Sequence, residues 1–347
     1  MSVTIQEARK VFERTAGLNE VTFPYRGGSH EFRFESDGTN SEVFLDLGGH
    51  EYRVDRDALT TALKRIPGTT EVMADRWPLR FLMEPLNFFF DHKEGDGRAI
   101  VLGDDIVSFT KPSALMFRPV EAFDAIVDAM EEGKGKKEKL IVHHIEHGIN
   151  ETRFSIASEG RFVDARPGDR TLGGLSFRGS LAGLIPLEVD AFTQRVVCSN
   201  GMISPDGQSR FRLGHLDGES ADGPLDVLRE WLHATSRELF AGEALEREMQ
   251  RLTHLTHQPI QGHSNDVLSD FFTRFSIPSN LRTGILESLG EEADGTMYGI
   301  VQSFTRAAQH HPDLSSRARD ALMRHAGSVS ASAAHLCGEC RRPTSIF

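Results

Sequence analysis

The sequence predicts an α+β fold, with a mixed or antiparallel β-rich core, interspersed helices and a helical C-terminal region. Runs of alternating apolar and polar residues dominate the middle of the chain, and this two-residue period is typical of strands. From Pro224 onward, leucines recur at the three- and four-residue spacing of amphipathic helices. The Gly- and Asp-rich stretch 216–223 separates the two patterns. A chain of 347 residues is long enough for two domains with separate cores.

Residues 1–98 are expected to form an N-terminal α/β region. A short amphipathic helix should occupy the first ~20 residues and end near Gly17. Asp55 or Asp57 is placed to cap a second helix. Strand patterns precede that helix at 30–34, 43–47 and 52–54.

The segment 76–90 is densely apolar and is interrupted by Pro78 and Pro85. Proline removes a backbone donor and disfavours helix in the residue before it, so we expect broken helix or loop here. Its apolar side chains are expected in the core or at a contact between copies of the chain.

Residues 99–220 are expected to form the β-rich core, with one helix near 120–132. A basic loop follows that helix and carries Lys134, Lys136, Lys137 and Lys139. Six runs fit strand patterns: 99–102, 106–109, 140–145, 152–156, 184–189 and 194–198.

The remaining chain divides into a helical region and a tail. Residues 221–330 carry the helical spacing, and residues 331–347 form a small-residue tail with a Cys-x-x-Cys pair. In that pair, Cys337 and Cys340 could bring two thiolates onto one tetrahedral zinc, with His335 as a third ligand. Cys198, His254 or His257 could complete the site by folding. Structural zinc, the one cofactor that the sequence suggests, and a tail with two unpaired thiols are both left open.

The charge balance narrows the classes of partner. Lys and Arg total 39 against 51 for Asp and Glu, so the formal net charge is −12. This excludes a polybasic membrane binder and disfavours sequence-blind coating of DNA, although a local basic patch remains compatible with it. No apolar run is long enough to span a membrane, no signal peptide is visible, and the cysteine count is odd at 3. A cytoplasmic protein is expected.

The run His143-His144-Ile145-Glu146-His147 resembles a metal cluster in composition. On a regular strand, His143 and His147 would point to one face while His144 and Glu146 would point to the other. This alternation divides the ligands between two faces and favours a polar strand over a metal site.

Arginines surround a predicted hairpin in the middle of the chain. The strand that begins at Arg195 ends in Asn200-Gly201, a pair that favours tight turns. Beyond it, Arg210 and Arg212 should project from one face, with Arg195 near them, where guanidinium groups could bind phosphates. A hairpin with solvent-facing arginines is the alternative.

The same segments resemble a phage- and plasmid-type protein family called domain of unknown function 932. The similarity extends over residues 100–330, and its most specific part is Arg195–Met202. Further matching segments are Gly174–Ser180, Arg212–His215, Thr296–Ala308 and an Arg-containing helix that reaches Ala326-Gly327. The chain departs from the family pattern at Gln302-Ser303, where Asn-Ala is usual, and at Arg178–Leu181. The resemblance implies a mobile-element setting and DNA metabolism, with no agreed enzymatic activity.

Three functions follow as hypotheses, in this order. The first is non-catalytic binding or annealing of single-stranded DNA by a homo-oligomer, through Arg195, Arg210 and Arg212 with the lysine loop. The second is a structural or host-interaction protein, related to defence either by countering it or by serving it, without affinity for nucleic acid. The third is a metal-dependent enzyme acting on nucleic acid through Asp206, His215 and Asp217. Phosphate-loop, nucleophile-elbow, zinc-protease and kinase motifs are missing from the sequence, which favours the non-catalytic hypotheses.

Overall fold

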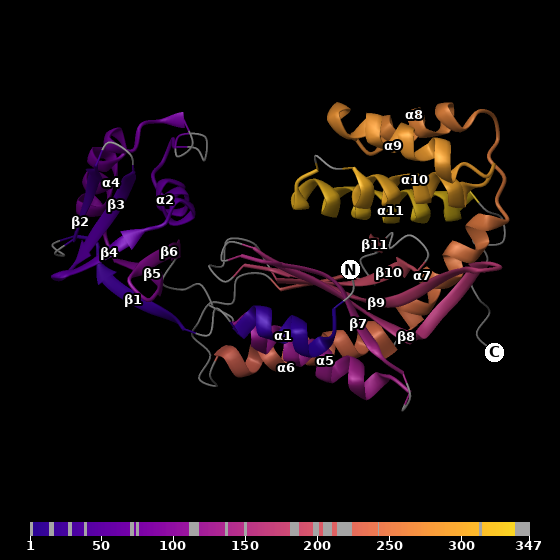
Figure 1. Ribbon diagram of the computed structural model, residues 1–347, viewed down its shortest axis with the longest axis horizontal. Coiled ribbons are helices and arrows are strands. Elements are labelled where there is room, and N and C mark those ends of the chain that lie inside the picture. Colours follow the sequence, from indigo (N-terminus) through magenta and orange to yellow (C-terminus); the bar gives the residue numbers. More distant parts are fainter. Residues whose placement is uncertain are drawn as a thin grey trace.

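The α+β prediction is confirmed by the computed structural model, in which two sheets and a C-terminal group of helices are present (Figure 1). Each sheet has its own apolar core. The structure describes residues 3–13, 17–26, 30–37, 40–69, 73, 76–110, 118–135, 138–148, 151–180, 187–196, 201–203, 210–213, 224–241, 243–311 and 314–336.

The N-terminal unit is a six-stranded sheet covered by helices. Its strand order is β1-β5-β6-β4-β3-β2, and all its neighbours are antiparallel except β4 and β6. Asp55 caps α2 as predicted, because its carboxylate accepts a hydrogen bond from the Asp57 amide at 2.7 Å. The elements are β1 (Leu18–Pro24), β2 (His30–Ser36), β3 (Ser41–Leu47), β4 (His50–Val54), α2 (Arg56–Leu63), η1 (Leu79–Phe81), α4 (Met83–His92), β5 (Asp96–Leu102) and β6 (Asp105–Thr110).

The N-terminal unit differs from the predicted region 1–98 at both ends. The predicted boundary lies inside β5, which pairs with β1 through Leu18 and Leu102. Helix α1 (Ile5–Glu13) belongs instead to the second unit, where Phe12 packs 5.1 Å from Phe123 and 5.5 Å from Phe154. The N-terminal unit is therefore an insertion between α1 and α5. Local alternation of side chains identifies a strand but does not identify its pairing partner.

The second unit has three layers, in which an antiparallel sheet lies between two layers of helices (Figure 1). Helices α1, α5 and α6 cover one face, and helices α8 to α11 lie on the other (Figure 1). The strand order is β11-β10-β9-β8-β7, and β12 also pairs with β10. These elements are α5 (Pro119–Gly133), β7 (Leu140–His147), β8 (Thr152–Arg166), β9 (Asp169–Gly179), β10 (Leu187–Arg195), β11 (Gly201–Ile203) and β12 (Arg210–Leu213).

The C-terminal region is helical, as predicted, but it does not form one separate layer. Helix α6 packs with α5 against the sheet, whereas α8 to α11 share a different apolar core. Helix α11 continues to Leu336, so the predicted tail begins inside a helix. The helices are α6 (Pro224–Ala241), α7 (Glu243–Thr256), α8 (Ser264–Arg274), α9 (Ser279–Glu292), α10 (Met297–His310) and α11 (Ser316–Leu336).

The two faces of the second sheet differ in chemistry. The face toward α5 and α6 is apolar and carries Phe154, Phe177 and Val189. The face toward α10 and α11 carries buried polar groups, including Arg153, Ser155, Ser176, Glu188 and Asp190. Buried polar groups of this kind require partners, so hydrogen bonds and ion pairs contribute to the contact between the sheet and the helical layer.

Candidate functional site

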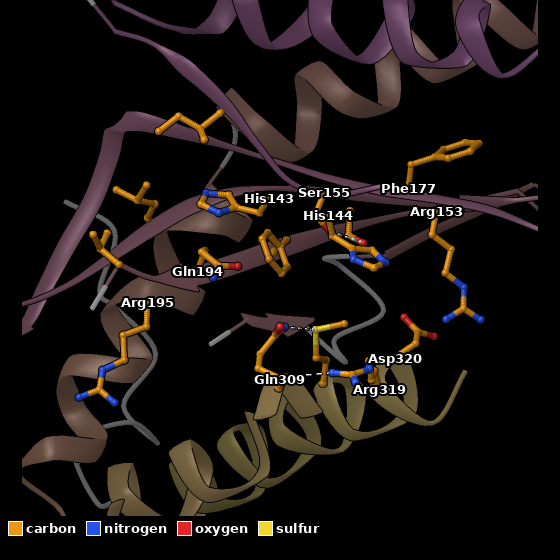
Figure 2. A pocket seen from close by; sticks show the side chains of 16 residues that line it. His143, His144, Arg153, Ser155, Phe177, Gln194, Arg195, Gln309, Arg319 and Asp320 are labelled. Carbon is orange, nitrogen blue, oxygen red and sulfur yellow. Dashed lines mark hydrogen bonds between the residues drawn. The ribbon is translucent and has the colours of Figure 1, made fainter. Parts of the chain in front are cut away.

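A pocket of about 470 Å³ lies between the polar face of the second sheet and helices α10 and α11 (Figure 2). We call it the sheet–helix pocket. Figure 2 shows strand residues on one side and residues of the two helices on the other. It is lined by Ile141, His143, His144, Arg153, Ser155, Leu172, Ser176, Phe177, Phe192, Gln194, Arg195, Val196, Gln309, Arg319, Asp320 and Met323. This lining holds three arginines and two histidines but one carboxylate.

A β-bulge brings both histidines to the pocket. The pairing of β7 with β8 shifts register between Val142 and His144, so the simple alternation expected from the sequence fails at this point. His143 and His144 both line the pocket as a result. His147 lies elsewhere, with its ring 5.3 Å from Phe12 and its Nδ1 3.1 Å from the Thr152 hydroxyl.

The half-buried ring of His143 is in its neutral form at neutral pH. Burial lowers the pKa of His143 to about 4, because a charged imidazolium loses hydration there. Within the described residues, the Nε2 atom of His143 is buried and has no hydrogen-bond partner. A buried ring nitrogen of this kind can bind a polar group that enters the pocket.

The guanidinium of Arg319 is positively charged and donates hydrogen bonds to uncharged groups. Its guanidinium donates to the carbonyl oxygens of Ala308 at 2.9 Å, Gln309 at 3.0 Å, His311 at 3.2 Å and Leu314 at 3.2 Å. These bonds satisfy carbonyls at and just beyond the end of α10, where a cation is favourable. Because all four acceptors are uncharged, these bonds fix the side chain without neutralising its charge.

A network of ion pairs forms the opposite end of the pocket from Arg195. Arg153 contacts Glu151 at 2.6 Å, and Arg178 is hydrogen-bonded to the same carboxylate. Arg324 of α11 lies 3.2 Å from Glu188, 3.0 Å from Asp190 and 3.1 Å from Asp320. The network links strands β8, β9 and β10 to α11.

The pKa of Asp320 is raised within this network. Burial raises the pKa of Asp320 to about 6, and the nearby carboxylates of Asp190 and Glu151 add to the rise. The charges of Arg153 and Arg178 oppose the rise. The one carboxylate in the pocket lining therefore takes up a proton in mildly acidic solution.

Arg195 lines the pocket, but its charge is balanced by two carboxylates. Its guanidinium lies 2.5 Å from Asp169 and 2.8 Å from Glu292, and 16% of its side chain is exposed. Tyr298 donates to the other oxygen of Asp169 at 3.0 Å. This network joins β9 and β10 to α9 and α10, so the predicted phosphate ligand has a clear structural role.

The backbone of β12 bears on the predicted cluster of Arg195 with Arg210 and Arg212. The backbone of β12 pairs Arg210 with Asp190 and Arg212 with Glu188. Arg195 lies five residues after Asp190 on β10. Its backbone is therefore about 16 Å from the position opposite Arg210, at the usual rise per strand residue, and farther still from the position opposite Arg212. The side chains of Arg210 and Arg212 lie outside the described part of the structure. Sequence alone could not set this register, because the chain between the two strands is long.

The lysine loop is described only in part. Lys134 contacts the carboxylate of Glu131 and the carbonyl of Glu138, both at 2.8 Å. Lys139 is exposed. Lys136 and Lys137 lie outside the described residues.

The predicted zinc ligands and the loop of the enzyme hypothesis are also largely outside the described residues. These are Cys337, Cys340, Cys198, Asp206, His215 and Asp217, while His335 is described only as part of the α11 backbone. Among the side chains that the structure describes, no group of three His, Cys, Asp or Glu residues is arranged to hold a metal.

Sequence reasoning missed the helix-borne half of the pocket. Arg319 and Asp320 lie on α11, within the Arg-containing helix of the family resemblance, which was the available signal. That signal indicates a helix but does not say which face meets the sheet.

Comparisons with known proteins found no match to this chain among family models, curated proteins or solved structures. The resemblance to domain of unknown function 932 stays a prediction. Over the part of the chain that the structure describes, no helix is both long and apolar enough to cross a membrane.

Proposed function

We propose that this protein binds single-stranded nucleic acid, and that one nucleotide of the strand enters the sheet–helix pocket. The observation that carries this proposal is the composition of the pocket lining. In a protein of net charge −12, the lining holds Arg153, Arg195 and Arg319 with a single carboxylate. Arg153 and Arg195 pair with carboxylates, whereas Arg319 donates to uncharged carbonyls and keeps its positive charge. A positive charge of this kind attracts phosphate despite an acidic background.

The pocket also offers groups that suit a sugar and a base. Ser155, Ser176 and Gln194 present hydroxyl and amide groups from the sheet, and Gln309 lies opposite on α10. Phe192 and Met323 add apolar surface. A volume of about 470 Å³ lies within the range of roughly 300–1,000 Å³ that is usual for small-ligand pockets. The expected arrangement places a phosphate near Arg319 and His144, and a base edge against the amide and hydroxyl groups.

Replacing Arg319 by glutamine should weaken the binding of a labelled dodecanucleotide about tenfold, because a charge-assisted contact with phosphate is lost. Fluorescence anisotropy between about 50 and 200 mM salt should show a salt slope shallower by about 0.7, the value for one phosphate contact on a single strand. Arg319→Lys keeps the charge and should retain most of the slope.

The matched control for this experiment is Arg229→Gln. Arg229 lies on α6, on the other side of the sheet, and 62% of its side chain is exposed. Circular dichroism should confirm that each variant folds, since Arg319 also bonds carbonyls at the end of α10. Equal binding by folded Arg319→Gln and by Arg229→Gln would remove the pocket from the proposal. Absence of binding by the unaltered protein at low salt would contradict the proposed function itself.

Binding should be tighter at about pH 5.5 than at about pH 7.5, by about fivefold if the charge of Asp320 changes the binding free energy by about 1 kcal/mol. The pKa of Asp320 is about 6, so the carboxylate is ionised at the higher pH and protonated at the lower one. Protonation removes the negative charge that repels a phosphate.

Asp320→Asn isolates this effect from other titrating groups, because it resembles the protonated carboxyl at every pH. The variant should bind like the unaltered protein at the lower pH and more tightly at the higher pH. An unchanged ratio of affinities between the two pH values would show that Asp320 does not control binding.

The altered pKa values of Asp320 and His143 favour a second candidate, an enzyme that acts on nucleic acid or nucleotides. Two groups with pKa values shifted to about 6 and about 4 line one pocket, as is common where protons are transferred. Incubation of labelled single strands and of nucleotides with the protein, followed by chromatography, tests this candidate. Product formation that is lost in Asp320→Asn would favour it over simple binding. The homo-oligomer expected from the sequence stays a prediction.

A further inference from the structure

The polar face of the second sheet continues beyond the sheet–helix pocket to an exposed aromatic residue. Phe162 of β8 pairs with Leu172 of β9, which in turn pairs with Gln194 of β10. Residues that lie directly opposite each other in antiparallel strands point to the same face. Leu172 and Gln194 line the pocket, so Phe162 continues the same row outward. Two strand spacings separate Phe162 from Gln194, or about 10 Å.

The next residues along these strands include the positively charged Arg170. The guanidinium of Arg170 lies 4.0 Å from the centre of the Phe162 ring. Val196 follows on β10, where its amide donates to the Arg170 carbonyl at 2.8 Å. Val196 also lines the pocket, which makes the surface continuous. We call Phe162, Arg170 and Val196 the Phe162 patch.

The Phe162 patch is exposed to solvent, although two of its residues are apolar. The exposed fractions are 45% for Phe162 and 50% for Val196. Arg170 is also half exposed, and its Nε lies 3.2 Å from Asp164. An aromatic ring with a stacked guanidinium offers flat surfaces to a nucleobase and is common where single strands bind. The ion pair with Asp164 fixes Arg170 and balances its charge, so the patch suits bases more than phosphates.

We infer that the Phe162 patch is a base-stacking site for the nucleotide next to the one in the sheet–helix pocket. This inference rests on the proposed function. It adds the path of the nucleic acid over the protein surface, which runs from the sheet–helix pocket across β9 toward β8. A base on Phe162 and its neighbour in the pocket would be held by the same rigid sheet. The two sites differ in chemistry, since one contacts phosphate and the other contacts the base.

Phe162→Ala should weaken the binding of a dodecanucleotide about fivefold to a hundredfold, as expected for the loss of one stacked base. Its salt slope should stay equal to that of the unaltered protein, because stacking releases no counterions. Phe162→Trp should restore binding. Arg319→Gln should instead reduce the slope, so the two variants separate stacking from phosphate contact.

The matched control is Phe88→Ala in the N-terminal unit, where Phe88 is 64% exposed on α4. It should bind like the unaltered protein. If Phe162→Ala also binds like the unaltered protein, the stacking site is wrong while the proposed function stands. A loss that Phe162→Trp does not restore, or one accompanied by a shallower salt slope, also overturns the stacking site. If the unaltered protein binds no oligonucleotide, the proposed function fails, and this inference fails with it.

Discussion

Replacing Arg324 by alanine should lower the free energy of unfolding by about 3–5 kcal/mol, the usual effect of removing one partner from a buried ion pair. The guanidinium of Arg324 is hydrogen-bonded to Glu188 and Asp320 and forms an ion pair with Asp190. Asp190 is 1% exposed and Glu188 is 7% exposed. Without Arg324, these buried carboxylates would lose a cationic partner, which costs folding free energy whether they stay charged or take up protons.

Urea denaturation at neutral pH measures this effect, with Arg229→Ala as the control. Arg229 lies 4.0 Å from Asp128, and both side chains are largely exposed, so its loss should change stability by less than about 1 kcal/mol. A similar small change in Arg324→Ala would contradict the claim that this arginine holds the helical layer on the sheet.

Replacing Gly174 by alanine should destabilise the protein by more than about 3 kcal/mol and leave little folded material. Gly174 lies in β9 between Ala157 of β8 and Phe192 of β10. A Cβ atom at this position would overlap the Ile156 carbonyl oxygen and lie 2.6 Å from the Cα of Ala157. Both are backbone atoms, so relief requires that two central strands separate.

Gly173→Ala is the control for this prediction, since it alters the neighbouring residue of the same strand. Its Cβ would lie 2.6 Å from the Met249 sulfur and 3.1 Å from a Leu245 methyl group. These are the ends of flexible side chains, which can move, so we expect a loss of about 1 kcal/mol. Expression yield and thermal unfolding compare the two variants. Equal stability in both would refute the backbone explanation for Gly174.

The sequence predicted local elements better than their pairing. The cap at Asp55 and the strands around Phe32 and Leu45 were recognisable, because caps and alternation depend on neighbouring residues. The assignment of β5 to the N-terminal sheet was not recognisable, since it depends on pairing with β1, more than 70 residues away. The bulge after Val142 was also missed, although it brings both His143 and His144 to the pocket.

The candidate site was predictable only where the sequence showed a strand motif. Arg195 was identified and does line the pocket, but its two carboxylate partners come from distant segments. Arg319 and Asp320 carried no motif of their own. Their importance arises from the face that α11 turns toward the sheet, which is a property of packing between distant elements.

The place of α1 in the second unit has a consequence for the order of folding during synthesis. Phe12 is made early, yet its neighbours Phe123 and Phe154 emerge more than 100 residues later. The N-terminal unit between them has its own core and can fold first. Until those residues are synthesised, the apolar side chains of the α1 segment have no packing partner and stay exposed. Exposed apolar segments of this kind favour chaperone binding. Truncation before β1 would remove this helix and leave the cluster of Phe123 and Phe154 incomplete in the finished chain.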